Sequence, residues 1–419
     1  MMVIATLSLL GAYLFGVYVE WKFYKGAVVA FYVSILIVYV MPQLYIIIAS
    51  TYSSEAVLLF TLWGVLFFIS FGILRFFLSV SIASKIRQVD LTKSVNCLIQ
   101  PCLSLFFVAG MLFLLVAIRF DLSEAINLNW AELRESAPSL LALANILFIL
   151  SSSLFIVLLK RGAWAFILVF MALLLVAVAL IKSRAILVAY LAPALLYFFY
   201  NAKKTLLWWV VGVAVVFLSM GLYVSVRAIR HVGSIATIAE NPALLLAAFT
   251  SADAGEFELI NAAYYIFENS TETDEFYSDS LLRRMLFFYL PSDFDYLKPR
   301  DFSHAIWDSF TNVLGVQGSY HVGAVLDSYF NNRVLGFLLY PLLYVFIFTV
   351  FEVFSRVSYF FGLVAYGPIV TACFYIGRGS IYNGTMILFS VFIVFGLVIL
   401  VSLAAKQFCR QMVRRSEGE

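Results

Sequence analysis

The chain has 419 residues, of which 64% are hydrophobic and only 12% are charged, and its formal net charge is +3. Soluble domains are about 45–50% apolar and about 25% charged, so this composition excludes an ordinary soluble protein. Apolar runs of about 20 residues recur along the sequence, and that length matches the roughly 30 Å hydrocarbon core of a bilayer. We therefore predict an all-α, polytopic integral membrane protein that forms one helix bundle.

The apolar runs predict about eleven transmembrane helices and one long external loop late in the chain. The predicted spans are residues 2–19, 27–49, 56–82, 97–118, 139–159, 163–181, 185–201, 205–224, 334–355, 357–376 and 383–405. They divide the chain into three regions. Residues 1–224 form the membrane bundle of spans one to eight, residues 225–333 form the large external loop, and residues 334–419 hold spans nine to eleven and a cytoplasmic tail.

The basic residues in the short loops predict the orientation, because cytoplasmic loops are enriched in lysine and arginine. The loop at 20–26 carries two lysines, the loop at 83–96 carries three basic residues, and the loop at 50–55 carries none. The tail after residue 405 is also basic. This pattern predicts an external N-terminus, a cytoplasmic C-terminus and an external position for residues 225–333.

Three basic residues break this pattern, because the predicted orientation places them in short external loops. Lys182 and Arg184 belong to "IKSRA", and Arg378 belongs to "GRGS". An external anion site explains the three exceptions together. The alternative is that a short loop tolerates one or two cations. Lys182 suits this alternative best, because a lysine can extend to lipid headgroups.

The external loop contains most of the residues that can transfer protons. It holds all three histidines and fourteen of the 24 acidic residues. Transporters usually place such residues within their spans, whereas the predicted spans here contain almost none. This distribution favours a reaction at the external face over passage through the bundle. The apolar stretches 243–249, 259–267 and 281–291 predict short helices that lie on the membrane interface or dip into it.

The loop predicts neither a metal site nor a disulfide framework. Its acidic stretch at 268–280 contains no histidine and is interpreted as a solvated turn region, and no zinc-type spacing occurs in the chain. The four cysteines lie outside the loop and show no metal-ligand spacing. We therefore expect no metal and no cofactor.

Both ends of the loop carry residues suited to chemistry on an anionic substrate. At the start, Arg227 and Arg230 share one helical face, and a guanidinium can bind phosphate oxygens in pairs. The alternative for these arginines is contact with lipid headgroups. At the end, His321 and Asp327 precede the ninth span, and either can act as a general base. The alternative for the histidine is a side chain exposed to water or bonded to headgroups.

Three stretches resemble the bacterial O-antigen polymerase family of the Wzy type and, more distantly, the O-antigen ligases. "IKSRAILVAYLAPALL" resembles the family's serine–arginine entry into a span, and "YLPSDFDYLKPRDF" resembles its proline-and-lysine segment in the large external loop. "VLDSYFNNRVLGFLLYPLL" resembles its pattern of an acid, tyrosine, asparagine and glycine that leads into a span. Asp327 and Arg333 depart from the pattern, because the family more often has glutamate and glycine there. The resemblance covers roughly residues 180–340.

The resemblance implies a metal-independent glycosyltransferase of lipopolysaccharide biosynthesis in the bacterial cytoplasmic (inner) membrane. A growing glycan would pass from undecaprenyl pyrophosphate to the non-reducing end of another lipid-linked repeat unit at the external face. His321 and Asp327 would be catalytic. The implied binding residues are Arg184, Arg227, Arg230 and Arg378 for the pyrophosphate and Lys298, Arg300, Tyr329 and Asn331 for the substrate. The implied partners are the undecaprenyl-pyrophosphate-linked oligosaccharide, membrane lipid and a chain-length regulator protein, with no nucleic acid.

Other functions stay open at this point. An O-antigen ligase would transfer the finished chain to a lipid A core with much the same chemistry, and the length of the accumulated product separates the two. A flippase or transporter of the same lipid-linked oligosaccharide should carry inward-facing charges in its spans and often an internal repeat, and neither is evident. A scaffold without chemistry leaves the external cations unexplained.

Overall fold

The computed structural model describes most of the predicted bundle and parts of the predicted loop. The described residues are 2–24, 26–82, 99–127, 133, 136–181, 184–201, 240–241, 256–269, 287, 306, 321–332, 335–354, 359–379, 381–394 and 396. Within this part of the chain every regular element is a helix and no strand occurs. The all-α prediction is therefore confirmed for the described residues.

The helices follow the predicted spans closely. The first group is α1 (Met2–Val19), η1 (Glu20–Tyr24), α2 (Val29–Ile35), η2 (Leu36–Val40), α3 (Met41–Ala49) and α4 (Ser54–Ile82). The second is α5 (Ile99–Ala117), α6 (Leu122–Asn127), α8 (Pro138–Leu150), α9 (Leu154–Arg161), α10 (Trp164–Ile181) and α11 (Arg184–Asn201). The last is α15 (Glu256–Asn269), α18 (Gly323–Asn332), α19 (Gly336–Phe354) and α20 (Tyr359–Gly377), followed by an apolar helix at Ile381–Val394. The segments η1 and η2 are π-helical turns.

The described helices identify a multi-pass membrane protein. Seven of them are long and apolar enough to cross a bilayer, and they coincide with predicted spans one to six and nine. Three shorter apolar helices coincide with predicted spans seven, ten and eleven. The outward side chains fit a lipid environment; on α10, for example, Phe166 is 65% exposed and Leu168 is 71% exposed. The predicted eighth span at 205–224 lies outside the described residues, so the total of eleven stays a prediction.

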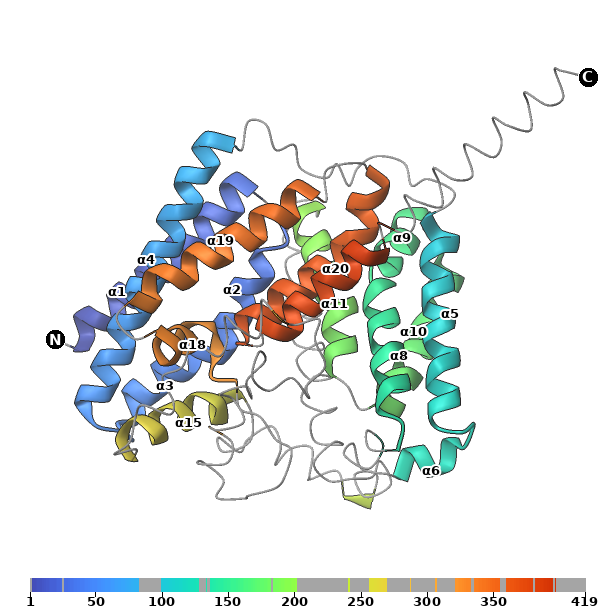
Figure 1. The fold of residues 1–419 in the computed structure, drawn as a ribbon, viewed down its shortest axis with the longest axis horizontal. Helices are drawn as coiled ribbons and strands as arrows, with labels where there is room; N and C mark the ends of the chain where they lie inside the picture. The colour runs from blue at the N-terminus through green and yellow to red at the C-terminus, as the bar shows by residue number, and fades with distance from the viewer. Residues whose placement is uncertain are drawn as a thin grey trace, which may run out of the picture.

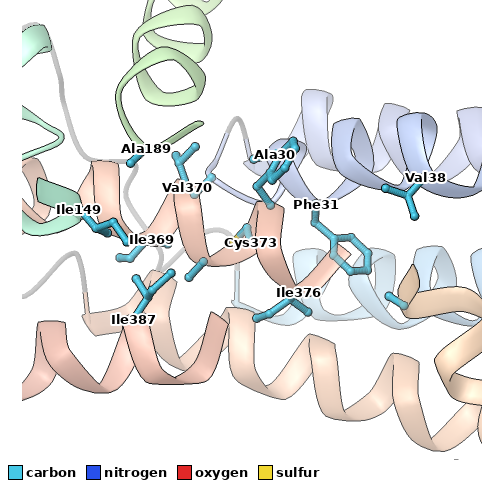
Figure 2. Close-up of a cluster of buried hydrophobic side chains, with 14 of the residues drawn as sticks. Ala30, Phe31, Val38, Ile149, Ala189, Ile369, Val370, Cys373, Ile376 and Ile387 are labelled. Carbon is cyan, nitrogen blue, oxygen red and sulfur yellow. The ribbon is translucent and has the colours of Figure 1, made fainter. Parts of the chain in front are cut away.

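Helix α20 runs through the middle of the bundle, between two groups of helices (Figure 1). One group contains α1 to α4 with α18 and α19, and the other contains α5 and α8 to α11. Figure 2 shows the core at their meeting point, where Ile369, Val370 and Cys373 of α20 lie near Ala30 of α2 and Ile149 of α8. All five side chains are buried. A helix that is apolar on every face suits this central position, because each face meets other helices.

The crossing of α20 with the α8–α9 break illustrates how the bundle satisfies its backbone inside the membrane. Pro368 has no N–H to donate, so the carbonyl of Val364, four residues earlier, loses its usual helical partner. The Ser153 hydroxyl, which is buried between α8 and α9, donates to that carbonyl at 3.2 Å. The same hydroxyl accepts a hydrogen bond from the Gly367 N–H at 2.9 Å. A hydroxyl between α8 and α9 thus replaces the donor that the Val364 carbonyl loses at the proline in α20.

Two helices from the predicted loop segment pack onto the bundle. The Trp63 indole N–H on α4 donates to the Val325 carbonyl at 3.1 Å and to the Ser328 hydroxyl at 2.9 Å, which fixes α18 against α4. For α15, the Tyr264 hydroxyl donates to the Gln43 side-chain oxygen at 2.8 Å. Burial raises the pKa of Tyr264, so this donor keeps its proton at neutral pH. Helices α15 and α18 are therefore joined to α3 and α4.

Candidate functional site

The junction of α18 with the end of α20 depends on two glycines. Gly323 begins α18 with a φ of +87°, and Gly379 follows α20 with a φ of +97°. Both values lie in the region that side chains rarely adopt. A Cβ on Gly379 would lie 2.7 Å from the Gly323 nitrogen and 2.9 Å from Asp327 Oδ2. Two backbone segments therefore approach to a distance that only glycine permits.

This α18–α20 junction gathers three of the predicted site residues. Asp327 lies on α18, is 2% exposed and has its carboxylate beside Gly379. His321 stands two residues before Gly323 and is half-buried. Arg378 immediately precedes Gly379 and is also half-buried. The two candidate bases and one candidate pyrophosphate ligand, which come from separate parts of the sequence, therefore meet at one place in the fold.

The surroundings of Asp327 are unusual for a carboxylate. The residues from Val322 to Ser328 are all buried, and α18 packs against α2, η2, α4, α15, α19 and α20. Burying a carboxylate costs free energy unless nearby donors or cations compensate it. The junction thus offers a carboxylate held in place, an imidazole at its edge and a cation, which together can accept a proton and bind an anion.

The other predicted site residues lie less centrally or outside the described part. The Tyr329 ring packs edge-on against Phe60 and Trp63 of α4, at centroid distances of 5.6 and 5.1 Å. This packing gives Tyr329 a role in seating α18, and its predicted contact with substrate stays a prediction. Asn331 lies on the last turn of α18 and Arg184 begins α11.

The pyrophosphate clamp as a whole remains a prediction. Arg227, Arg230, Lys298 and Arg300 lie outside the described residues. Lys182, the weaker external cation, does so as well. Among the residues that the structure describes, no group of three His, Cys, Asp or Glu side chains is arranged to share a metal ion.

A buried ionic triad, which the sequence interpretation missed, lies away from this junction. Arg75 on α4 donates from Nη2 to Glu20 Oε2 at 2.8 Å and to Glu352 Oε1 at 2.8 Å. Its Nη1 donates to Glu352 Oε2 at 3.1 Å, and its Nε donates to Glu20. The Tyr24 ring lies 3.7 Å from the guanidinium carbon, and the Tyr24 hydroxyl donates to the Arg75 carbonyl at 2.7 Å. Arg75 and Glu20 are fully buried, and Glu352 is 6% exposed.

The triad joins η1, α4 and α19 through charges placed within or at the ends of apolar helices. Arg75 and Glu352 are among the few charges inside predicted spans, and Glu20 directly follows the first predicted span. Their signal was available in the sequence, since Arg75 and Glu352 are isolated charges inside predicted spans, and such residues usually have partners. The sequence did not show which acidic residues pair with Arg75, because Arg75 is 55 residues from Glu20 and 277 from Glu352.

Searches with family models, among curated proteins and among solved structures find no match to this chain.

Proposed function

We propose that this protein polymerises lipid-linked oligosaccharide repeat units as a metal-independent glycosyltransferase at the external face of the bacterial inner membrane. The donor would be a glycan on undecaprenyl pyrophosphate, and the acceptor would be the non-reducing end of another lipid-linked repeat unit. The observation that carries the proposal is the α18–α20 junction, where Asp327, His321 and Arg378 meet beside two glycines of positive φ. The resemblance of the α18 segment to the polymerase pattern supplies the substrate class.

The chemistry requires a base and cations, and the junction supplies both kinds of group. Asp327 or His321 removes the proton from the acceptor hydroxyl as its oxygen attacks the anomeric carbon of the donor sugar. The bond between that carbon and the pyrophosphate oxygen breaks, and the electron pair leaves with the lipid pyrophosphate. Arg378, joined by Arg184, Arg227 and Arg230 in this proposal, stabilises the negative charge that develops on the leaving group. Pyrophosphate is a stable anion, so the reaction needs no general acid.

The test is the pattern of cell-surface polysaccharide in a strain that lacks the gene, complemented with wild type or with single variants. We expect the deletion strain to show the lipid A core with a single repeat and wild type to restore the ladder. Asp327→Asn and Arg378→Ala should each fail to restore it while the protein remains inserted. Arg161→Ala is the matched control, because Arg161 is exposed and donates a hydrogen bond to Gln100 away from the junction.

Other results of the same experiment favour other functions. Long polymer that accumulates on its lipid carrier in the deletion strain would indicate a ligase. Full ladders from both Asp327→Asn and Arg378→Ala would refute the assignment of the junction as the catalytic site.

A transporter of the same lipid-linked oligosaccharide is the second candidate, and the triad is the observation in its favour. Buried charges within spans are typical of transport pathways. Against this, four of the five N–H donors of Arg75 bond the two carboxylates, so the guanidinium has little capacity left for a substrate. Absence of any repeat unit at the surface of the deletion strain would favour transport over polymerisation.

A further inference from the structure

The π-helical turn η1 directs two of its residues into the bundle and two away from it. Glu20 and Tyr24 are buried and both contact Arg75, the first through its carboxylate and the second through its ring and hydroxyl. Trp21 and Lys22, which lie between them, are exposed. Hydrogen bonds in a π-helix join residues i and i+5, so residues four or five apart lie on the same side. The contacts with Arg75 therefore determine which side of the turn faces outward.

Aromatic contacts fix the outward side of η1 as well. The Trp21 ring packs on the Tyr200 ring of α11 at a centroid distance of 5.0 Å. The Phe23 ring packs edge-on against Phe76 of α4 at a centroid distance of 5.8 Å. The turn is thus fixed to both α4 and α11, and it presents Lys22 from a well-anchored segment.

The Lys22 ammonium is itself held in one position. Its Nζ donates to the Tyr18 hydroxyl at 2.6 Å and lies 5.1 Å from the centre of the Tyr18 ring and 5.4 Å from that of the Phe23 ring. An ammonium has three N–H donors, so two remain for an acceptor outside the protein. Ordering a mobile lysine side chain costs conformational entropy. These contacts already order Lys22, so a ligand that binds its ammonium meets a smaller cost.

The charge of Lys22 has no carboxylate partner among the described residues. Glu20, only two residues away, is turned inward and accepts hydrogen bonds from Arg75 at both of its oxygens. The ammonium lies instead beside Tyr18, which is 53% exposed, and next in the chain to Trp21, which is 40% exposed. Tyrosine, tryptophan and lysine together favour the boundary between acyl chains and headgroups.

The face of α1 that leads to Tyr18 suits an acyl chain. Leu7, Gly11, Leu14 and Tyr18 recur at spacings of three and four residues, so they share one side of the helix. Leu7 is 64% exposed and Leu14 is 60% exposed. Nothing lies within 4 Å of the Cβ position on Gly11, between the two leucines. A ligand that joins an anion to a hydrocarbon chain therefore fits this surface better than a soluble anion does.

We propose that Tyr18, Trp21 and Lys22 bind the phosphate headgroup of an anionic phospholipid at the end of α1, on the membrane side predicted to be cytoplasmic. The Lys22 ammonium donates to the phosphate oxygens, and the Tyr18 hydroxyl, which accepts from Lys22, can donate its own proton to the same phosphate. The Trp21 ring lies at the level of the headgroup boundary. The site does not depend on the proposed function.

The test measures how closely a brominated lipid approaches Trp21, because bromine quenches tryptophan fluorescence at short range. The protein is reconstituted in phosphatidylcholine nanodiscs that contain a small share of brominated phosphatidylglycerol or of brominated phosphatidylcholine. The signal of Trp21 is the difference between each protein and its Trp21→Phe derivative. Wild type should enrich phosphatidylglycerol beside Trp21 by about fivefold over phosphatidylcholine, which is the effect expected of one lysine near a membrane surface.

Substitutions of Lys22 separate its charge from the rest of the surface. Lys22→Gln should remove the preference for phosphatidylglycerol, and Lys22→Arg should keep most of it because the cation is retained. Arg161→Gln is the matched control and should keep the wild-type preference. Arg161 is an exposed cation in another loop on the same predicted side of the membrane, where it donates to Gln100.

Two outcomes would overturn the site: equal quenching by the two lipids in wild type, or an unchanged preference in Lys22→Gln. Inorganic phosphate added at constant ionic strength tests the source of the anion. A preference that survives the added phosphate supports a lipid, whereas a preference that phosphate abolishes would overturn the lipid in favour of a soluble phosphate compound. None of these measurements involves polymer formation, so failure of the polymerase proposal would leave the result standing.

Discussion

Among the described residues, two buried acidic sites show two ways of keeping a carboxylate inside a membrane bundle. In the triad, Glu20 and Glu352 face a guanidinium that donates four hydrogen bonds to them, and a tyrosine ring covers it. At the α18–α20 junction, Asp327 lies against Gly379, and Arg378 immediately precedes that glycine in the chain. In the first site both carboxylates are hydrogen-bonded to Arg75, and these bonds join three helical segments. In the second, the carboxylate lies near His321 and Arg378, which is why we propose a structural role for the first site and chemistry for the second.

Removal of the triad cation gives the largest expected effect. Arg75→Met leaves two carboxylates buried without their cation, and breaking such an arrangement costs about 3–5 kcal/mol. We expect little folded protein, measured as the monodisperse fraction and its melting temperature in detergent. The triple variant Glu20→Gln, Arg75→Met, Glu352→Gln is the control, because it removes all three charges and should recover much of the stability. A single variant as stable as wild type would show that the triad is not structural.

The second prediction concerns the glycine crossing at the junction. Gly379→Ala should abolish polymer formation and destabilise the fold by about 1–3 kcal/mol, because alanine at positive φ is strained and its Cβ meets Gly323 and Asp327. Gly162→Ala is the matched control, since Gly162 has a φ of +64° with open space around its Cβ position. The control carries the strain without the contact. The activity of both variants is measured by the polysaccharide ladder. Equal losses in the two would show that the close contact of Gly379 with Gly323 and Asp327 is not what the function requires.

The spans could be predicted from the sequence because hydropathy is local, whereas these two sites are made by contacts between distant residues. An apolar run of about 20 residues can be recognised from that stretch of sequence alone. Helix α18 is short and carries Asp327 and Ser328, so its sequence predicted part of an external loop. Its burial depends on Trp63, Gly336 and Gly379, which lie far away along the chain. The candidate residues His321, Asp327 and Arg378 were predicted from chemistry and topology, but their meeting was not.

The third prediction tests how firmly α18 must be held for Asp327 to work. Trp63→Phe keeps most of the aromatic packing and removes the indole N–H that bonds Val325 and Ser328. We expect a loss of about 1–2 kcal/mol in stability and a clear fall in polymer length. Trp164→Phe is the control, because Trp164 is 68% exposed on the outer face of α10. A normal ladder from Trp63→Phe would mean that the remaining contacts of α18 position Asp327 without this anchor.

The smallest expected effect concerns two neighbouring serines, of which one hydroxyl forms hydrogen bonds and the other has no hydrogen-bond partner. Ser153→Ala removes both the donor to the Val364 carbonyl that Pro368 leaves free and the acceptor for the Gly367 N–H. It should destabilise the bundle by about 1 kcal/mol. The Ser152 hydroxyl is equally buried but has no hydrogen-bond partner, so Ser152→Ala should be neutral or slightly stabilising. The measurement is the melting temperature of each variant compared with that of the wild type. Equal values would mean that hydrogen bonding at this crossing contributes no net stability, and the saturation of the triad would then be a weaker argument for its structural role.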